Sequence, residues 1–264
     1  MTNTNGGPTV TLARGGIEMP LLGFGTWQAT GQRAYDAVRV ALETGYRHID
    51  TATMYRNERE LGRALRDSGV PRASVFLTTK LPPGNAGRED ETLAANLRAL
   101  DVDQVDLWLI HWPPNGQARP ETWKAMLHAR DEGRTRAVGV SNYSIPLIDD
   151  LIRATGEAPA VNQVPWSPAR HDPAVLQAHR ERGVVLEGYS PLRGTDLGDP
   201  VLIEIAAARG KTPAQVVLRW HVEHEIVVIP KSVTPARIRE NFDVLDFSLT
   251  PGEVARIDGL SRTR

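Results

Sequence analysis

The sequence of 264 residues contains no cysteine, and lysine is scarce: of 31 basic residues only four are lysines, namely Lys80, Lys124, Lys211 and Lys231. Without cysteine the chain can form no disulfide, use no thiol nucleophile and bind no metal ion through sulfur. Because arginine is the usual cation of this chain, a lysine in a candidate site indicates that a compact ammonium group is needed there.

Long apolar runs and an excess of one charge are also lacking. The longest largely apolar run, VDLWLI at residues 105–110, is too short to cross a bilayer, and residues 1–16 contain neither the basic nor the apolar segment of a signal peptide. The net charge of -1 gives no reason to expect a polyanion or a membrane as partner. We therefore expect a cytoplasmic, monomeric globular protein that binds neither nucleic acid nor membranes.

Short β-rich segments alternate with stretches of helical periodicity. The expected strands cover residues 21–25, 46–50, 74–80, 105–111, 135–141, 159–164, 183–190 and 226–231. The expected helices between them cover residues 34–45, 57–69, 88–100, 121–133, 145–156, 173–183 and 212–224, and five of these end on a glycine that can close a helix.

This strict alternation indicates right-handed βαβ units and a parallel sheet. An open doubly wound sheet is the competing architecture, but eight units within about 250 residues favour a (β/α)8 TIM barrel. We expect a single domain over residues 1–264, with a short N-terminal extension at 1–20 and a C-terminal helix at 251–260.

Two other kinds of site have weak support in the sequence. The segment GFGTWQ, residues 23–28, begins like a dinucleotide-binding G-x-G-x-x-G, but Gln28 replaces the third glycine and no long helix follows immediately. Neither an H-E-x-x-H motif nor a set of His, Asp and Glu at ligand spacing is found, so no metal site is expected.

Polar side chains stand where three consecutive expected strands end. Asp50, Lys80 and His111 follow one another at intervals of 30 and 31 residues, one βα unit each. Equivalent positions on neighbouring barrel strands converge at the C-terminal face, where barrel enzymes keep their chemistry. Tyr55 follows Asp50 by five residues and can fold back over the same opening.

These four side chains suit the protonation of a carbonyl oxygen. The Lys80 ammonium is expected to lower the pKa of the Tyr55 phenol, Asp50 to supply the counter-charge, and His111 to donate a hydrogen bond to the carbonyl. Each residue taken alone has a structural alternative, such as an ion pair or a capping histidine, but their joint placement favours a site. His48 is expected only to pack or to bind the backbone.

Several motifs resemble the aldo-keto reductase superfamily, in particular its bacterial 2,5-diketogluconate reductase-like members. They are GFGTW, HIDTATMYRNE, TTK, LIHWP, GVSNY, NQV, YSPL, IPKS and ENFDVLDFSLT, and the similarity runs from about residue 8 to residue 260. The resemblance implies that Asp50, Tyr55, Lys80 and His111 form a catalytic tetrad. This tetrad would reduce aldehydes and ketones with hydride from NADPH, with Tyr55 as the general acid.

The resemblance also implies cofactor-binding residues. Ser141, Asn142 and Gln163 would hold the nicotinamide carboxamide, Tyr189 would stack on its ring, and a helix beginning near Thr234 and Pro235 would face a phosphate. The full expected set is Gly25, Thr26, Asp50, Ser141, Asn142, Gln163, Tyr189, Ser190, Pro191, Leu192, Lys231, Ser232, Val233, Arg237, Glu240 and Asn241.

Trp27, Trp112 and Trp166 are expected to form aromatic walls around the substrate carbonyl. The flanking loops are short, and the chain stops soon after the C-terminal helix, so an open pocket with broad substrate tolerance is expected. Two alternatives stay open: a non-catalytic NADP(H)-binding regulatory barrel, and a Schiff-base aldolase that uses Lys80.

Overall fold

A closed parallel barrel forms the centre of the molecule, and the computed structural model describes residues 7–261. Eight strands pair in chain order, each parallel to the next. The last strand returns to the first: Gly23 N donates to Val228 O at 2.9 Å and Gly25 N to Pro230 O at 3.1 Å. The predicted (β/α)8 barrel is therefore confirmed. Its strands are β3 (Phe24–Gly25), β4 (His48–Asp50), β5 (Phe76–Leu81), β6 (Val105–Ile110), β7 (Thr135–Ser141), β8 (Val161–Pro165), β9 (Val185–Tyr189) and β10 (Val227–Val228).

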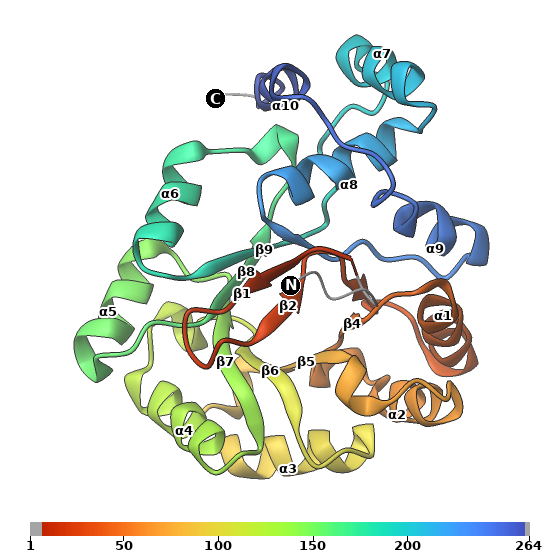
Figure 1. Cartoon of the computed structure of the whole chain (residues 1–264). Coiled ribbons are helices and arrows are strands. Elements are labelled where there is room, and N and C mark those ends of the chain that lie inside the picture. The colour runs from red at the N-terminus through yellow and green to blue at the C-terminus, as the bar shows by residue number, and fades with distance from the viewer. Residues whose placement is uncertain (1–6, 262–264) are drawn as a thin grey trace.

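Helices surround this barrel, as the view along its axis shows (Figure 1). Within residues 7–261 they are α1 (Gly31–Thr44), α2 (Glu58–Asp67), α3 (Glu89–Leu100), α4 (Pro120–Asp131), α5 (Ile145–Thr155), α6 (Pro173–Glu181), α7 (Pro200–Arg209), α8 (Pro213–Glu223), α9 (Pro235–Phe242) and α10 (Pro251–Asp258). The five glycines expected to close helices all have positive φ values.

One helix, α7, was not expected from the sequence. Its residues PVLIEIAAAR are apolar on most sides and therefore lack the helical alternation of apolar and polar positions. The local signals are at its start, where the Asp199 side chain accepts from Val201 N at 2.8 Å and Pro200 occupies the first turn.

The strand β6 illustrates why the apolar runs became barrel strands. Leu107 and Leu109 are buried in the cluster inside the barrel, whereas Trp108 and Ile110 belong to the cluster between the strands and the helices. Both faces of a barrel strand are covered, so a nearly continuous apolar sequence is needed.

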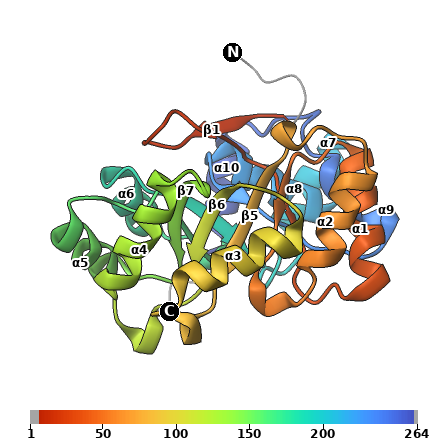
Figure 2. The ribbon, with the colours of Figure 1, turned by 90° about the horizontal axis from the view of Figure 1, so that it is seen from below.

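The expected N-terminal extension contains a hairpin that closes one end of the barrel; residues 1–6 lie outside the described part. The hairpin pairs β1 (Thr9–Thr11) with β2 (Glu18–Pro20) and lies across one end of the molecule (Figure 2). Leu12 and Met19 are fully buried in the cluster inside the barrel. The chemistry-bearing side chains lie at the other end. Between residues 7 and 261, no helix has the length and apolar character needed to cross a membrane.

Candidate active site

A buried ion pair lies where β4 and β5 end. Lys80 Nζ is 2.7 Å from each carboxylate oxygen of Asp50 and donates to Thr51 O at 2.9 Å. Burial alone would lower the pKa of Lys80, but the Asp50 carboxylate together with Tyr55 and Glu187 outweighs burial, and the pKa lies above its usual value. The ammonium therefore stays charged, with all three of its N–H groups engaged.

Tyr55 lies beside this pair because a short 3-10 turn, Thr53–Tyr55, follows β4. The turn is fixed to the neighbouring strand by Thr53 Oγ1, which donates to Lys80 O at 2.9 Å. Lys80 Nζ is 5.2 Å from the centre of the Tyr55 ring. Arg56 leaves the turn with a φ of 56°, a left-handed conformation that is uncommon outside glycine.

The electrostatics of Tyr55 differ in part from the expectation. Burial raises the pKa of the Tyr55 phenol, and the nearby Lys80 ammonium lowers it, as predicted, but by less than burial raises it. The net pKa is therefore above the usual value, and the phenol holds its proton at neutral pH.

His111 completes the group immediately after β6. Its ring is edge-on to that of Tyr55, with 5.6 Å between the ring centres. Burial, together with the Lys80 charge, lowers the pKa of His111 to about 3. The imidazole is therefore neutral at physiological pH and carries a single N–H for a ligand.

A chain of hydrogen bonds crosses the neighbouring strand ends. Tyr189 Oη donates to Asn142 Oδ1 at 2.9 Å, Asn142 Nδ2 donates to Ser141 Oγ at 2.9 Å, and Ser141 Oγ donates to Gln163 O at 2.8 Å. Gln163 Nε2 in turn donates to Asp50 Oδ2 at 2.9 Å. These polar groups thus form one network with the ion pair.

A cavity of about 590 Å³ opens above this network. Thirteen of the residues expected at the cofactor or catalytic site line it, which are Gly25, Asp50, Tyr55, His111, Ser141, Asn142, Gln163, Tyr189, Ser190, Pro191, Leu192, Lys231 and Asn241. Five further residues that line the cavity were not predicted from the sequence, namely Gln28, Met54, Arg193, Ile229 and Pro230. A hollow of similar volume, about 610 Å³, lies outside the barrel between α1 and α9 and holds none of the strand-end side chains.

Of the three tryptophans expected at the substrate site, two line the cavity and one does not. Trp27 and Trp112 line the cavity and are 53% and 47% exposed. Trp166 is only 3% exposed, and its ring packs against His171 rather than lining the cavity. Trp166 N still donates to Tyr189 O at 3.2 Å, so the alternation of the strand places this side chain with Val164 in the core between β8 and the helices. The structure does not bring it together with the other two tryptophans.

The remaining expected residues lie beside the cavity. Lys80, Thr26 and Ser232 are buried beneath its surface, and Val233 and Glu240 are half-buried at α9. Glu240 Oε1 accepts from Thr212 Oγ1 at 3.0 Å, so its carboxylate is already engaged away from the cavity.

Three cations gather near the start of α9. Thr234 and Pro235 are the N-cap and first residue of this helix, as predicted, and the Thr234 side chain makes no capping bond. Within residues 7–261, the exposed side chains of Lys231 and Arg237 form no ion pair or hydrogen bond, and the same is true of Arg33. Burial, followed by the nearby Arg33, lowers the pKa of Lys231. Unpaired cations at a helix N-terminus form a suitable anion site.

Buried polar residues below the cavity were missed by sequence reasoning. Asn57 is fully buried, and its Nδ2 donates to Thr26 O and Ala29 O at 3.0 and 2.9 Å while its Oδ1 accepts from Thr51. It therefore ties the loops after β3 and β4 together. Asn57 is also the N-cap residue of α2, and asparagine is common at that position. The sequence therefore gives no reason to assign it a role in joining the loops.

Glu187 and His48 form a second buried polar pair inside the barrel. Both are fully buried, with 3.8 Å between His48 Nε2 and Glu187 Oε1, and His48 Nε2 lies 3.3 Å from Thr78 Oγ1. Burial, reinforced by the Asp50 charge, raises the pKa of Glu187 to about 8. His48 was expected to pack or bind the backbone, whereas the structure also gives it this carboxyl neighbour.

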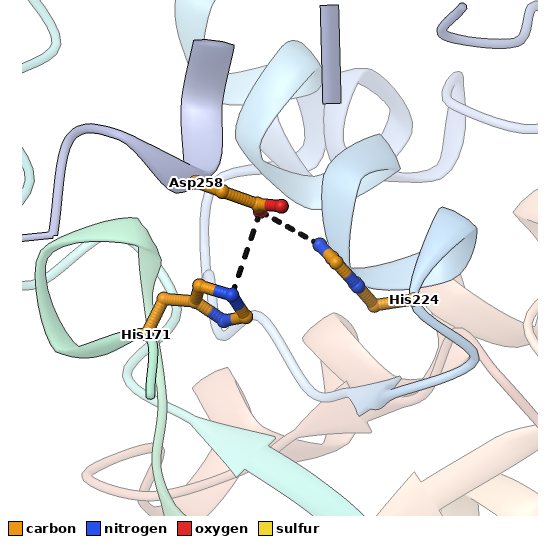
Figure 3. Close-up of side chains that lie close together, drawn as sticks. All are labelled: His171, His224 and Asp258. Atoms are coloured by element: carbon orange, nitrogen blue, oxygen red, sulfur yellow. Dashed lines mark hydrogen bonds and ion pairs between the residues drawn. The ribbon is translucent and has the colours of Figure 1, made fainter. Parts of the chain in front are cut away.

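A third group of polar side chains was not found by the search for ligand spacing along the chain. His171, His224 and Asp258 point toward one another from separate elements (Figure 3). Residues this far apart in the sequence share no spacing motif.

The sequence matches known proteins along nearly its whole length. Residues 21–262 match the model of the aldo/keto reductase family. The chain is 46% identical over 258 residues to an aldo-keto reductase of Mycolicibacterium smegmatis, covering 96% of this chain and 93% of that protein. It is 42% identical over 258 residues to the methylglyoxal reductase DkgA of Escherichia coli strain K12, covering 95% and 94%.

The structure is also similar to that of a solved aldo/keto reductase. The aldo/keto reductase from Brucella melitensis superposes with a TM-score of 0.92 at 42% sequence identity, covering 97% of this chain and all of that one. Matches at this identity and coverage extend beyond a shared barrel architecture to a common family. The chain belongs to the aldo/keto reductase family.

Proposed function

We propose that this oxidoreductase reduces aldehydes and ketones to alcohols with NADPH, and that Tyr55 is the general acid. The observation that carries the proposal is the convergence of Tyr55, His111 and the Asp50–Lys80 pair on one wall of a single cavity. A buried phenol, a neutral imidazole and a fixed ammonium suit the transfer of one proton to a carbonyl oxygen.

The residues around the cavity fit a nicotinamide dinucleotide phosphate. The side chains of Ser141, Asn142 and Gln163 supply amide and hydroxyl groups beside Tyr189, and unpaired cations surround the start of α9. Ser190, Pro191 and Leu192 would lie along the pyrophosphate. The site would be completed by Lys231, Ser232, Val233, Arg237 and Asn241 with Gly25 and Thr26. A cofactor bound there would supply the hydride.

The proton that the carbonyl oxygen needs would come from a side chain of the protein. Tyr55 holds its proton because burial raises its pKa, and the Lys80 ammonium stabilises the phenolate that remains after transfer. His111 is neutral and can donate its single N–H to the same carbonyl oxygen, which orients that oxygen toward the phenol. Asp50 keeps Lys80 charged and in place.

The substrates we propose are small aldehydes and activated ketones, with α-oxoaldehydes among them. The named activity of the 42% identical relative, methylglyoxal reduction, supports this class. Trp27, Met54 and Trp112 provide exposed apolar surface at the cavity mouth, which favours binding by contact rather than by strict hydrogen-bond readout.

The aldolase alternative has little support in the geometry. A Schiff base needs a free, unprotonated amine. Lys80 instead has a raised pKa and three hydrogen-bond acceptors around its ammonium. A purely regulatory barrel would not need the four groups to converge on one cavity.

The proposal is tested by following NADPH absorbance with a panel of aldehydes, α-oxoaldehydes, α-keto esters and diketo sugars. We expect stoichiometric formation of alcohol and oxidised cofactor with several small members of the panel. Cofactor binding without turnover of any carbonyl would contradict catalysis and favour the regulatory alternative. Trapping of substrate on Lys80 by borohydride would instead favour the aldolase.

A further inference from the structure

The cluster of His171, His224 and Asp258 lies apart from the catalytic cavity, since none of its members lines that cavity. His171 precedes α6, His224 follows the last residue of α8, and Asp258 ends α10. Asp258 Oδ1 is 2.8 Å from His224 Nε2 and 3.7 Å from His171 Nε2 (Figure 3). One ligand atom from each residue lies within 4.8 Å of the other two.

The carboxylate is oriented by a neighbour outside the cluster. Trp220 Nε1 donates to Asp258 Oδ1 at 2.7 Å. The Trp220 ring also packs edge-on against both imidazoles, with 5.3 Å to the centre of His171 and 4.8 Å to that of His224. Support of this kind around the first ligands is usual in metal sites, where it fixes carboxylate and imidazole orientation.

The His171 ring is buried without a hydrogen bond to any described residue. Its side chain is only 6% exposed, its Nδ1 is buried with no hydrogen-bond partner anywhere in residues 7–261, and its Nε2 is too far from Asp258 for a hydrogen bond. Burying a polar ring without partners costs free energy. The folded chain therefore buries one ring nitrogen of His171, Nδ1, without a partner in the described part of the chain, while the other, Nε2, faces the Asp258 carboxylate at a distance of 3.7 Å.

We propose that His171, His224 and Asp258 bind a divalent transition-metal ion of the zinc type. Two imidazole nitrogens and one carboxylate oxygen match the preference of such ions, and the partial exposure of His224 (17%) and Asp258 (30%) leaves a position for water. Tetrahedral ligand atoms about 2.0–2.1 Å from zinc lie about 3–4 Å apart, so small movements suffice: His171 approaches slightly, and the 2.8 Å pair of His224 and Asp258 separates slightly.

Such an ion would tie three separate parts of the chain together. It would link α10 to the end of α8 and to the segment after β8, replacing the hydrogen bond between His224 and Asp258. Because the ion binds only the folded arrangement, it would raise the stability of the protein.

The first test is direct binding by the full chain, prepared without a polyhistidine tag and freed of metal by a chelator. Zn²⁺ is titrated against a chromophoric chelator, and Tm is measured with and without the ion. We expect one equivalent of Zn²⁺ per chain and a rise in Tm of about 5–10 °C at a hundredfold excess over Kd, with no rise from Mg²⁺ or Ca²⁺. Failure to bind Zn²⁺ at one equivalent would overturn the proposal.

The second test uses variants matched for residue type. His171→Gln and Asp258→Asn should each weaken Zn²⁺ binding by at least about tenfold, and Asp258→Asn keeps an acceptor for Trp220. The control His128→Gln removes an exposed histidine on α4 that pairs with Glu132, and it should leave Zn²⁺ affinity unchanged. Metal-free circular dichroism and Tm show whether each variant folds. A folded His171→Gln protein with wild-type affinity would contradict the site.

Discussion

At the scale of single residues, the buried Asp50–Lys80 pair shows how a costly arrangement is stabilised. Two charges removed from water lose hydration that their attraction alone does not always restore. Here Thr51 O and Gln163 Nε2 satisfy further hydrogen-bonding capacity of Lys80 and Asp50. Removing either partner would leave an unpaired charge inside the barrel, so the pair is expected to be intolerant of substitution.

A first prediction concerns Glu187, which is fully buried and whose pKa is raised to about 8. Between about pH 4.5 and pH 8 the unfolded chain loses this proton while the folded chain keeps it, so stability falls with rising pH by up to ~1.4 kcal/mol per unit. Glu187→Gln removes this contribution. Urea unfolding should therefore show the variant gaining stability relative to wild type from pH 5 to pH 8. An equal difference at both pH values would show that Glu187 does not titrate in this way.

The convergence of the proposed catalytic residues could be predicted from the sequence because one βα unit separates them. Asp50, Lys80 and His111 each stand at a strand end, and a parallel barrel brings strand ends together whatever the details of packing. Glu187 could not be assigned in the same way, since a polar residue within a strand can face either the surrounding helices or the barrel interior. Only the register, in which Gln163 is opposite Glu187, decides this.

At the scale of elements, the start of α9 carries the proposed preference for NADPH. Each charge-assisted contact to a phosphate contributes about 1.5–3 kcal/mol. Arg237→Ala should therefore reduce the preference for NADPH over NADH by about tenfold or more, as measured by fluorescence titration with both cofactors. Arg239→Ala is the matched control, because Arg239 lies in the last turn of α9 beside the outer hollow. Equal losses in both variants would indicate a nonspecific charge effect.

Two elements show the limit of sequence reasoning at this scale. The hairpin of β1 and β2 has strands of three residues each, too short for a periodic pattern to appear. The helix α7 has Ile203 half exposed and no continuous polar face. Both elements are fixed by tertiary contacts, with the barrel floor and with α8 respectively, rather than by local propensity.

At the scale of the whole molecule, buried histidines govern the response to acid. Burial is the largest cause of the lowered pKa values of His48 and His221, about 4 each, and of His111, about 3. Below pH 6.5 these three histidines become protonated in the unfolded chain but stay neutral in the folded protein. The free energy of unfolding therefore falls as the pH falls toward 4.

This effect predicts proton uptake on unfolding near pH 5. Three histidines take up protons and Glu187 releases about one, which leaves a net uptake of about two. The slope of unfolding free energy against pH should then be about 2.7 kcal/mol per unit between pH 4.5 and pH 6. A flat or opposite slope would mean that the histidines are not buried neutral.

The proposed carbonyl reduction is tested most directly at Tyr55. Turnover of an α-oxoaldehyde and the Kd for NADPH are measured side by side for wild type and Tyr55→Phe. Tyr35→Phe is the control, because the Tyr35 hydroxyl donates to Asp67 on the surface and does not line the cavity. Loss of the general acid should lower kcat by about 10²–10⁴ while the Kd changes little, since the proton is needed only in the transition state. A Tyr55→Phe enzyme that keeps a tenth or more of wild-type kcat would contradict the account.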